Sequence, residues 1–362
     1  MNLVQEIQAL TEITPDALAR KLGASVADVR SWADGHPIPA AHDGPLRAFL
    51  ARARERRPSG TRKPSPSVTP GVLTGDSIEL VRTLPSASVD MILSDIPYGI
   101  GHDDWDVLHD NGNSAYLGRS AAQKKAGKVF DKRRKPINGW SAADREIPRE
   151  YERWCTSWAG EWHRVLKPGG SAIVFAGRRL AHRCICALED AGFNYRDMLA
   201  WLRPRAVLRA QRLSTVFRKR GEASEAELWE GWRLGNLRPV FEPVLWFFKP
   251  YKVTIVDNVL DHGLGAFNLE AFERLTGAAD NVLQLGFRPG ETGHHEAQKP
   301  VELLRVLIEL CCPPDALVLD PFAGSGSTGV AANACGRRSL LIERDPSLVR
   351  IAKRRLAEAA HP

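Results

Sequence analysis

A short glycine-rich segment near the carboxyl end constrains the fold of this chain more than any other feature. Residues 317–319 form an apolar run typical of a buried strand, and Asp320 ends it. Three glycines follow at G-x-G-x-x-G spacing, just before a stretch of helical composition: Gly324, Gly326 and Gly329. Glycines at this spacing let the backbone approach a ligand at a helix N-terminus. The segment therefore predicts a nucleoside-binding turn between a strand and a helix.

An acidic residue at the end of the next strand supports this interpretation. Glu343 closes the run RSLLIE, where a carboxylate can accept hydrogen bonds from both ribose hydroxyls. The motif alone fits NAD as well as S-adenosylmethionine. A dinucleotide-binding domain has further strands and helices after this acid, whereas here one helix follows before Pro362. The other strands are therefore expected upstream, in a circularly permuted nucleoside-binding fold.

Strands and helices alternate along the chain from about Gly71. Apolar strands are predicted at VDMIL, SAIVFA and PVLWFF, and a helix at PSLVRIAKRRLAEAA. Alternation with continuous apolar strands is typical of a parallel, doubly wound sheet covered by helices on both faces. We expect an α/β protein with a mostly parallel, Rossmann-like sheet.

Residues 1–51 are expected to form a separate small helical domain. Thr14 and Pro15 mark a helix start, Gly23 marks its end, and Ser25 opens a second short helix. Two short helices joined by a tight turn resemble a helix-turn-helix. A plain helical hairpin used for packing or for a dimer contact fits the same residues.

Residues 52–70 are rich in Arg, Pro and Ser and predict a linker, which leaves 71–362 as the main domain.

The composition excludes several classes of protein. A hydrophobic share of 43% and a charged share of 26% are ordinary globular values. The six cysteines form no CxxC pair, which argues against a zinc finger and for reduced thiols. No apolar run approaches the roughly 20 residues of a membrane span, so a cytoplasmic protein is expected.

A tetrapeptide at the end of an earlier strand indicates the reaction. Asp95-Ile96-Pro97-Tyr98 follows VDMILS, and other segments surround it in a fixed order: LTGDSIELVRTLPSASVD before it, then EWHRVLKPGG, RPVFEPVLWFFK, HHEAQKPVELL and LDPFAGSGSTG. This ordered set resembles the beta class of DNA amino-methyltransferases, the permuted group in which the catalytic D-P-P-Y motif precedes the cofactor loop. The resemblance spans about Gly71 to Leu356 and implies bacterial or phage origin.

The resemblance implies methylation of an exocyclic amino group. Such an amine is a poor nucleophile because its lone pair is delocalised into the ring, so it needs acceptors for its N–H groups. The Asp95 carboxylate and the Ile96 carbonyl would be these acceptors. Pro97 would fix the turn, and Tyr98 would stack on a base flipped out of the duplex. Ile96 departs from the family, which usually has proline there, so the turn loses one fixed φ and gains an N–H.

The implied methyl donor is S-adenosylmethionine. Glu343 would bind its ribose, and Asp76 would lie near its adenine amine. No metal is expected, because the pair His294 and His295 has no third ligand at a recognisable spacing. The remaining residues would surround the glycine loop and the methionine end: Asp320, Phe322, Gly324, Gly326, His295, Gln298, Lys299 and Pro300.

Double-stranded DNA is the expected partner. The formal net charge of +7 suits a polyanion, and two segments concentrate basic residues. One lies in a long polar loop over residues 102–150, a candidate clamp. The other lies within 178–290, where the family inserts its target-recognition region, and can neutralise phosphates or read guanine edges. The predicted contacts are Lys132, Arg133, Arg134, Lys135, Arg203, Arg205, Arg209, Arg212, Arg218, Lys219 and Arg220.

Aspartate at the first catalytic position favours adenine N6, because cytosine-N4 members of the family more often have serine there. The sequence leaves three alternatives open: cytosine N4 methylation, methylation of RNA or a protein amide, and a DNA-binding regulator with a decayed methyltransferase site. A homodimer and a paired restriction endonuclease are also compatible with it.

Overall fold

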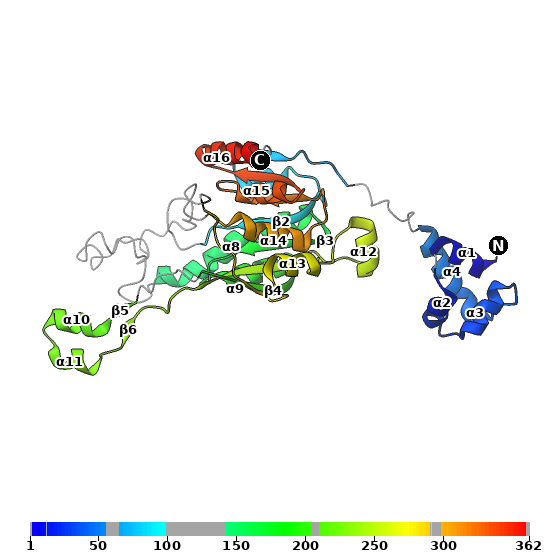
Figure 1. The fold of residues 1–362 in the computed structure, drawn as a ribbon, viewed down its shortest axis with the longest axis horizontal. Coiled ribbons are helices and arrows are strands. Elements are labelled where there is room, and N and C mark those ends of the chain that lie inside the picture. Colours follow the sequence, from blue (N-terminus) through cyan, green and yellow to red (C-terminus); the bar gives the residue numbers. More distant parts are fainter. Residues whose placement is uncertain are drawn as a thin grey trace. The chain divides into compact units, whose positions relative to one another are not determined.

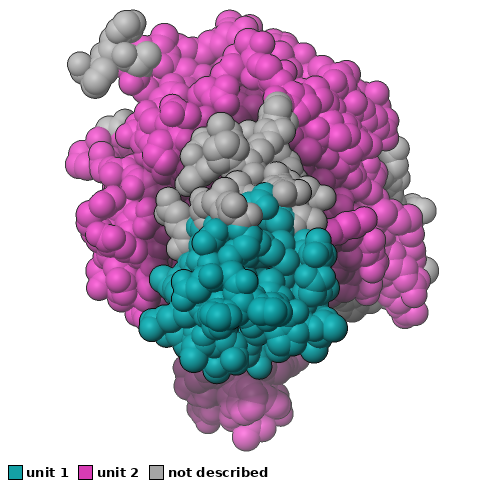
Figure 2. All heavy atoms as spheres, turned by 90° about the vertical axis from the view of Figure 1, so that its right-hand side faces the viewer, with its two compact units in different colours: residues 1–63 teal, residues 64–362 magenta. Residues whose placement is uncertain are grey.

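The computed structural model describes residues 2–11, 13–55, 65–98, 142–203, 210–289, 291 and 298–359. They belong to two compact units, residues 1–63 and residues 64–362, which Figure 2 draws in teal and magenta. Each unit has a hydrophobic core of its own.

The described residues of unit 1 form four helices: α1 (Leu3–Thr11), α2 (Pro15–Leu22), α3 (Val26–Ala33) and α4 (Ala40–Glu55). The helix signals predicted at Thr14, Gly23 and Ser25 are present. The Thr14 side chain accepts a hydrogen bond from the backbone N–H of Ala17, and Gly23 ends α2 with a φ of 64°. Ser25 and Asp28 cap the start of α3 reciprocally. The unit's core is Val4, Ile7, Leu18, Ala19, Val29, Trp32, Leu46 and Leu50.

Unit 2 is built on an eight-stranded sheet (Figure 1), whose strands run in the order β1-β10-β9-β2-β3-β7-β4-β8. All are parallel to one another except β7, which is antiparallel to both neighbours. The predicted mostly parallel sheet is confirmed. The strands are β1 (Gly71–Thr74), β2 (Val89–Asp95), β3 (Leu166–Phe175), β4 (Asn194–Leu202), β7 (Phe241–Phe248), β8 (Val282–Leu283), β9 (Leu317–Asp320) and β10 (Arg338–Glu343).

Helices cover both faces of this sheet. One core lies beneath α8 (Ala142–Val165) and α9 (Ala181–Asp190), with α5 (Ser77–Arg82) beside α8. The core of the opposite face lies beneath α13 (Leu269–Thr276), α14 (Val301–Cys311) and α15 (Ser327–Ala334). The last helix, α16 (Pro346–Ala359), packs on α15, and α12 (Ile255–His262) lies near β3.

Residues 210–240 form a smaller substructure. Strands β5 (Gln211–Arg212) and β6 (Arg233–Leu234) pair with each other, and α10 (Leu213–Arg220) packs against α11 (Ala223–Leu228). Trp229 and Trp232 contact each other edge to face, with ring centroids 5.2 Å apart. Trp232 is 62% exposed, in contrast to the buried Trp201. Trp201 is therefore a residue of the hydrophobic core, whereas Trp232 is not.

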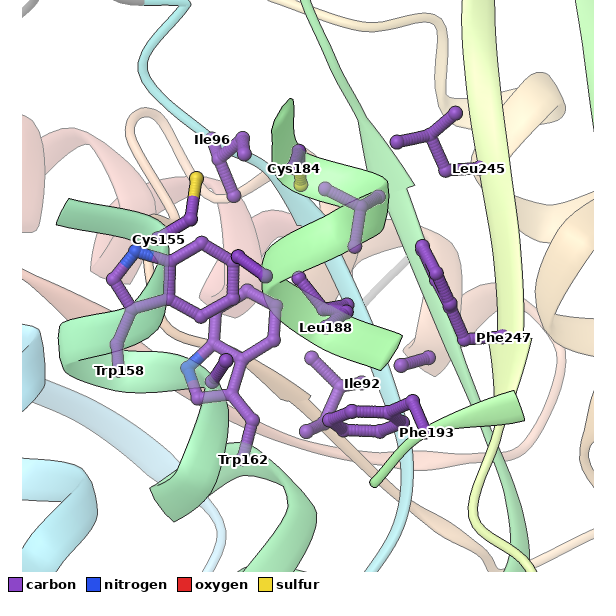
Figure 3. Packing of buried hydrophobic residues seen from close by; sticks show 14 of the residues in the cluster. Ile92, Ile96, Cys155, Trp158, Trp162, Cys184, Leu188, Phe193, Leu245 and Phe247 are labelled. Atoms are coloured by element: carbon purple, nitrogen blue, oxygen red, sulfur yellow. The ribbon is translucent and has the colours of Figure 1, made fainter. Parts of the chain in front are cut away.

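The largest buried side chains of the first core come from one face of α8. Trp158 and Trp162, one helical turn apart, are each 1% exposed, and their ring centroids are 4.1 Å apart. Figure 3 shows them packed towards Cys155, Cys184 and Phe193. Burial of this aromatic stripe fixes α8 on the sheet.

Two predicted boundaries are wrong. The polar loop expected over 102–150 ends earlier, because α8 already begins at Ala142 and includes Pro148. The buried residues Ile147 and Tyr151 continue the apolar stripe of the helix, and this packing outweighs the tendency of Pro148 to break a helix. Strand β3 begins at Leu166, before the predicted strand SAIVFA, because Gly169 and Gly170 lie between β2 and the end of β7.

In the described part of the chain, no helix has both the length and the apolarity needed to cross a lipid bilayer. The cysteine thiols are free: Cys184, Cys311 and Cys312 are buried, whereas Cys186 is exposed.

The aromatic stripe of α8 yields a stability prediction. Trp162→Ala should lower the free energy of unfolding by about 3–5 kcal/mol, because it leaves a large cavity between α8 and the sheet. Trp232→Ala removes the same side chain from an exposed position and should change it by less than about 0.5 kcal/mol. Urea unfolding followed by circular dichroism measures both. Equal effects of the two substitutions would contradict the packing described for α8.

Candidate functional site

The site lies at the carboxyl edge of the sheet, where β9 and β2 are neighbours. From β9 the chain continues through α15 to β10 on one side, and from β2 through α8 to β3 on the other. Ligands of open α/β sheets bind in the crevice at such a switch point. A cavity of about 430 Å³ opens here, and it is lined by Asp95, Asp320 and Glu343 together with Asp76, Trp154 and Gln298.

The glycine loop forms one wall of the cavity. Gly326 caps α15 with a φ of 82°, and a Cβ there would lie 2.7 Å from the Cβ of Ala352 in α16. Only glycine fits this backbone conformation and this close contact. The next glycine of the predicted motif, Gly329, lies within α15, where it allows close packing against Leu341 and Leu356. The glycines therefore serve both the loop and the packing of its helix.

Asp320 ends β9 and is 3% exposed. Its carboxylate accepts hydrogen bonds from the hydroxyls of Ser94 (2.7 Å) and Thr328 (2.6 Å) and from the backbone N–H of Phe322 (3.1 Å). Burial raises the pKa of Asp320 to about 6, although these three hydrogen bonds favour the carboxylate. A carboxylate held in this way is ready to stabilise a cationic ligand group.

The other two predicted acids also face the cavity. Glu343 ends β10, and its two oxygens accept hydrogen bonds from the backbone N–H groups of Gly324 (2.9 Å) and Asp345 (2.8 Å). Asp76 is the N-cap of α5, where one oxygen accepts from the backbone N–H groups of Ile78 and Glu79. Both carboxylates are thus held by backbone donors and keep lone pairs for a ligand.

Aromatic rings complete the cavity wall. Phe322 packs near three tryptophans of α8, and its ring centroid is 5.7 Å from that of Trp154 and 6.2 Å from that of Trp162. Trp154 lines the cavity, and sequence reasoning missed it. The spacing of Trp154, Trp158 and Trp162, four residues apart, was the available signal, because it places them on one helix face.

The predicted catalytic tetrapeptide follows β2 directly. Asp95 is the last residue of the strand, and Ile96 is 1% exposed and belongs to the core beneath α8 (Figure 3). The carbonyl of Pro97 accepts a hydrogen bond from the Tyr151 hydroxyl at 3.2 Å. The apolar Ile96 side chain thus fills a core position, while packing and the Tyr151 bond hold the turn.

Both oxygens of Asp95 have partners in the site. Lys299 Nζ lies 2.5 Å from Oδ2, and the Tyr98 hydroxyl donates to Oδ1 at 2.9 Å. Burial raises the pKa of Asp95, and the Lys299 ammonium opposes this rise. Tyr98 lies close to Gly177, where a Cβ would be 2.9 Å from the Tyr98 Cβ. Glycine at position 177 is therefore needed to seat the tyrosine.

The segment just before α14, which contains Gln298, Lys299 and Pro300, lies between Asp95 and the residues expected to bind the cofactor. Lys299 and Gln298 line the cavity. The Lys299 ammonium points to Asp95, although Lys299 was expected near the methionine end of the cofactor. The Oε1 atom of Gln298 is buried and has no hydrogen-bond partner among the described residues. Pro300 is the N-cap of α14 and is not part of the cavity lining. His294 and His295 lie outside the described residues.

Glu242 and Arg203 extend the charged group around Asp95, and neither was predicted for this role. Glu242, at the start of β7, lies 3.4 Å from the Tyr98 hydroxyl and 3.7 Å from Lys299 Nζ. Arg203, predicted as a DNA contact, donates a short hydrogen bond to Glu242. Strand pairing brings them together, because β7 lies between β3 and β4. A sequence pattern does not reveal this order.

The predicted DNA contacts are only partly within the described structure. Arg212 ends β5, and Arg218, Lys219 and Arg220 form the last turn of α10 with exposed side chains. Arg218 also pairs with Glu230 at 2.9 Å. The other predicted contacts lie outside the described residues: Lys132, Arg133, Arg134, Lys135, Arg205 and Arg209.

Comparisons with known proteins agree with this geometry. The model of a family described as DNA methylase (N6_N4_Mtase) matches residues 89–354. The chain is 47% identical to the type II methyltransferase M.HindIII of Haemophilus influenzae, over 79% of this chain and 94% of that protein. Two solved structures share the fold. The cytosine-N4-specific PvuII DNA methyltransferase has a TM-score of 0.52 and 19% identity, and covers 82% of this chain and 90% of that chain. A putative DNA modification methylase from Thermus thermophilus, complexed with S-adenosylmethionine, has a TM-score of 0.50 and 20% identity, and covers 81% and 95%.

The family match spans all three acidic strand ends of the cavity, Asp95, Asp320 and Glu343, and the identity to M.HindIII extends over most of both chains. The chain therefore belongs to the N6/N4 DNA methylase family and is a DNA methyltransferase.

Proposed function

We propose that the protein transfers the methyl group of S-adenosylmethionine to N6 of an adenine flipped out of double-stranded DNA. One observation carries the proposal: Asp95 lines the same cavity as Asp320 and Glu343. An acceptor for an amino group and a set of cofactor ligands thus border one cavity, as direct transfer of a methyl group requires.

The residues of the cavity suit the cofactor. Glu343 supports ribose binding, because its carboxylate is fixed by backbone donors at the end of β10. Asp320 suits the cationic methionine end, as does Gln298 Oε1, which has no hydrogen-bond partner in the described part of the chain. Trp154 offers an aromatic wall for the adenine ring, with Phe322 packed beside it. When bound, the cofactor supplies an electrophilic methyl group.

The target amine would be held by Asp95 and by the Ile96 carbonyl. Accepting N–H hydrogen bonds at these two points draws the nitrogen towards tetrahedral geometry and stabilises the positive charge that develops on it. Lys299 and Tyr98 occupy Asp95 in the free protein, so the arriving base must share or replace these partners. The buried Ile96 side chain shows good packing at the unusual position, which argues against a decayed site.

DNA binding is assigned to the basic residues of the predicted recognition region. Arg212, Arg218, Lys219 and Arg220 have exposed side chains within a short stretch, which suits contacts to phosphates. Lys132–Lys135, Arg205 and Arg209 are proposed to contribute from the segments outside the described residues. A restriction endonuclease paired with this methyltransferase would recognise the same site.

Nucleoside mass spectrometry distinguishes adenine from cytosine. Mixed-sequence duplex DNA, incubated with the purified protein and S-adenosylmethionine, should contain N6-methyladenine. N4-methylcytosine instead would keep the acceptor role of Asp95 and overturn the base. Methylated RNA or protein in the absence of any methylated DNA base would overturn the substrate class.

The raised pKa of Asp320 predicts that cofactor binding weakens in acid. A protonated Asp320 cannot stabilise a cationic group, so the Kd of S-adenosylmethionine should rise up to roughly tenfold between pH 7 and pH 5. Titration calorimetry on the wild type and on Asp320→Asn tests the role of Asp320 in cofactor binding, since the variant should bind weakly and its Kd should not depend on pH in this range.

The same shift affects protein stability. The folded pKa of Asp320, about 6, lies above the ordinary 3.8. The stability that this group contributes is therefore present at low pH and lost as the pH rises through 6.

A further inference from the structure

Glu242 lies beside the acceptor Asp95 because of the direction of its strand. Strand β7 runs antiparallel to β3, so its first residues share the sheet edge where β2 ends. Glu242 is opposite Trp201 of β4, and its side chain is 13% exposed. A carboxylate so nearly buried needs hydrogen-bond or ionic partners, and its partners are the residues of the site.

The Tyr98 hydroxyl lies between the two carboxylates. It is 2.9 Å from Asp95 Oδ1 and 3.4 Å from Glu242 Oε2. A hydroxyl can donate one hydrogen bond and accept another at the same time. It can therefore take a proton from one carboxyl group while it gives its own proton to the other.

Two cations balance the two carboxylates. Lys299 Nζ lies 2.5 Å from Asp95 and 3.7 Å from Glu242, and Arg203 bonds to the other oxygen of Glu242. An ammonium group such as that of Lys299 has no lone pair, so it stabilises both anions rather than accepting a proton. The charged groups around Glu242 are thus Asp95, Lys299 and Arg203, with Tyr98 as the neutral link.

The positions of the two carboxylates relative to the cavity differ. Asp95 lines the cavity, so a bound base and cofactor cover it, whereas Glu242 does not line it. Glu242 instead borders Arg203, whose side chain is 52% exposed. A proton that reaches Glu242 can therefore leave towards solvent while the cavity remains filled.

We infer that Glu242 is the terminal acceptor of the proton released by methylation, and that the Tyr98 hydroxyl relays it from Asp95. This inference rests on the proposed function. Formation of the carbon–nitrogen bond leaves the nitrogen with a positive charge and one surplus proton. That proton passes to Asp95; Asp95 then protonates the Tyr98 oxygen as the hydroxyl proton moves to Glu242. Glu242 releases it to water, and Asp95 and Tyr98 regain their starting states.

Glu242→Gln and Tyr98→Phe test the relay. Gln keeps the size of the side chain and an acceptor for Arg203 but is not a base, and Phe keeps the ring but removes the hydroxyl. Each should lower kcat on the order of a hundredfold, with the Kd values for DNA and cofactor unchanged and with a larger solvent deuterium isotope effect on kcat than the wild type. The double variant should be no slower than either single variant, because both interrupt one path.

Glu309→Gln is the matched control. Glu309 is as buried as Glu242, at 10% exposure, and pairs with Arg305 and Arg274 on α14 and α13; its variant should keep the wild-type kcat. Wild-type kcat in Glu242→Gln or in Tyr98→Phe would overturn the relay alone. A fall in activity explained by weaker DNA binding would also overturn it, since it would give Glu242 a structural role. A wild type that methylates no DNA base would overturn the proposed function itself.

Discussion

One hydrogen bond joins the two halves of this site. The Ser94 hydroxyl, in β2, donates to Asp320, the last residue of β9, at 2.7 Å. Asp95 follows Ser94 directly, so the bond fixes the residue proposed to accept the base relative to the residue proposed to bind the cofactor. Both strands are buried on both faces, and neither can slide without breaking the bond and the cores that flank it. The geometry needed for methyl transfer is therefore set by the sheet.

Charge balance is the second constraint on the site. Asp95, Asp320 and Glu242 are three carboxylates at one sheet edge, and burial opposes ionisation of Asp95 and Asp320. The Lys299 ammonium balances the negative charge of Asp95, while hydroxyl and backbone donors form hydrogen bonds to Asp320. Asp95 and Asp320 thus have different environments. These suit Asp95 to an amino group and Asp320 to a cationic cofactor.

Much of the fold and half of the site could be predicted from the sequence, because strand ends leave local signals. Asp95, Asp320 and Glu343 each end an apolar run, and the glycines after Asp320 mark the loop. Parallel strands bring such ends to one edge, so these residues converge.

The residues that were missed depend on non-local packing. Glu242 and Arg203 meet only because β7 lies between β3 and β4, and no local pattern encodes that order. The polar loop expected up to residue 150 includes a segment where the buried stripe of α8 continues. Lys299 was assigned to the cofactor, but its ammonium pairs with Asp95, because α14 begins beside the end of β2.

Our central proposal is that Asp95 binds the base while Asp320 and Glu343, which line the same cavity, bind the cofactor. The most direct test measures S-adenosylmethionine binding by calorimetry and methyl transfer to DNA in Asp95→Ala. We expect a cofactor Kd close to that of the wild type, which also shows that the variant is folded, with methyl transfer reduced by at least about a hundredfold. Wild-type methyl transfer, or loss of cofactor binding in a variant that circular dichroism shows to be folded, would contradict the separation of the two roles.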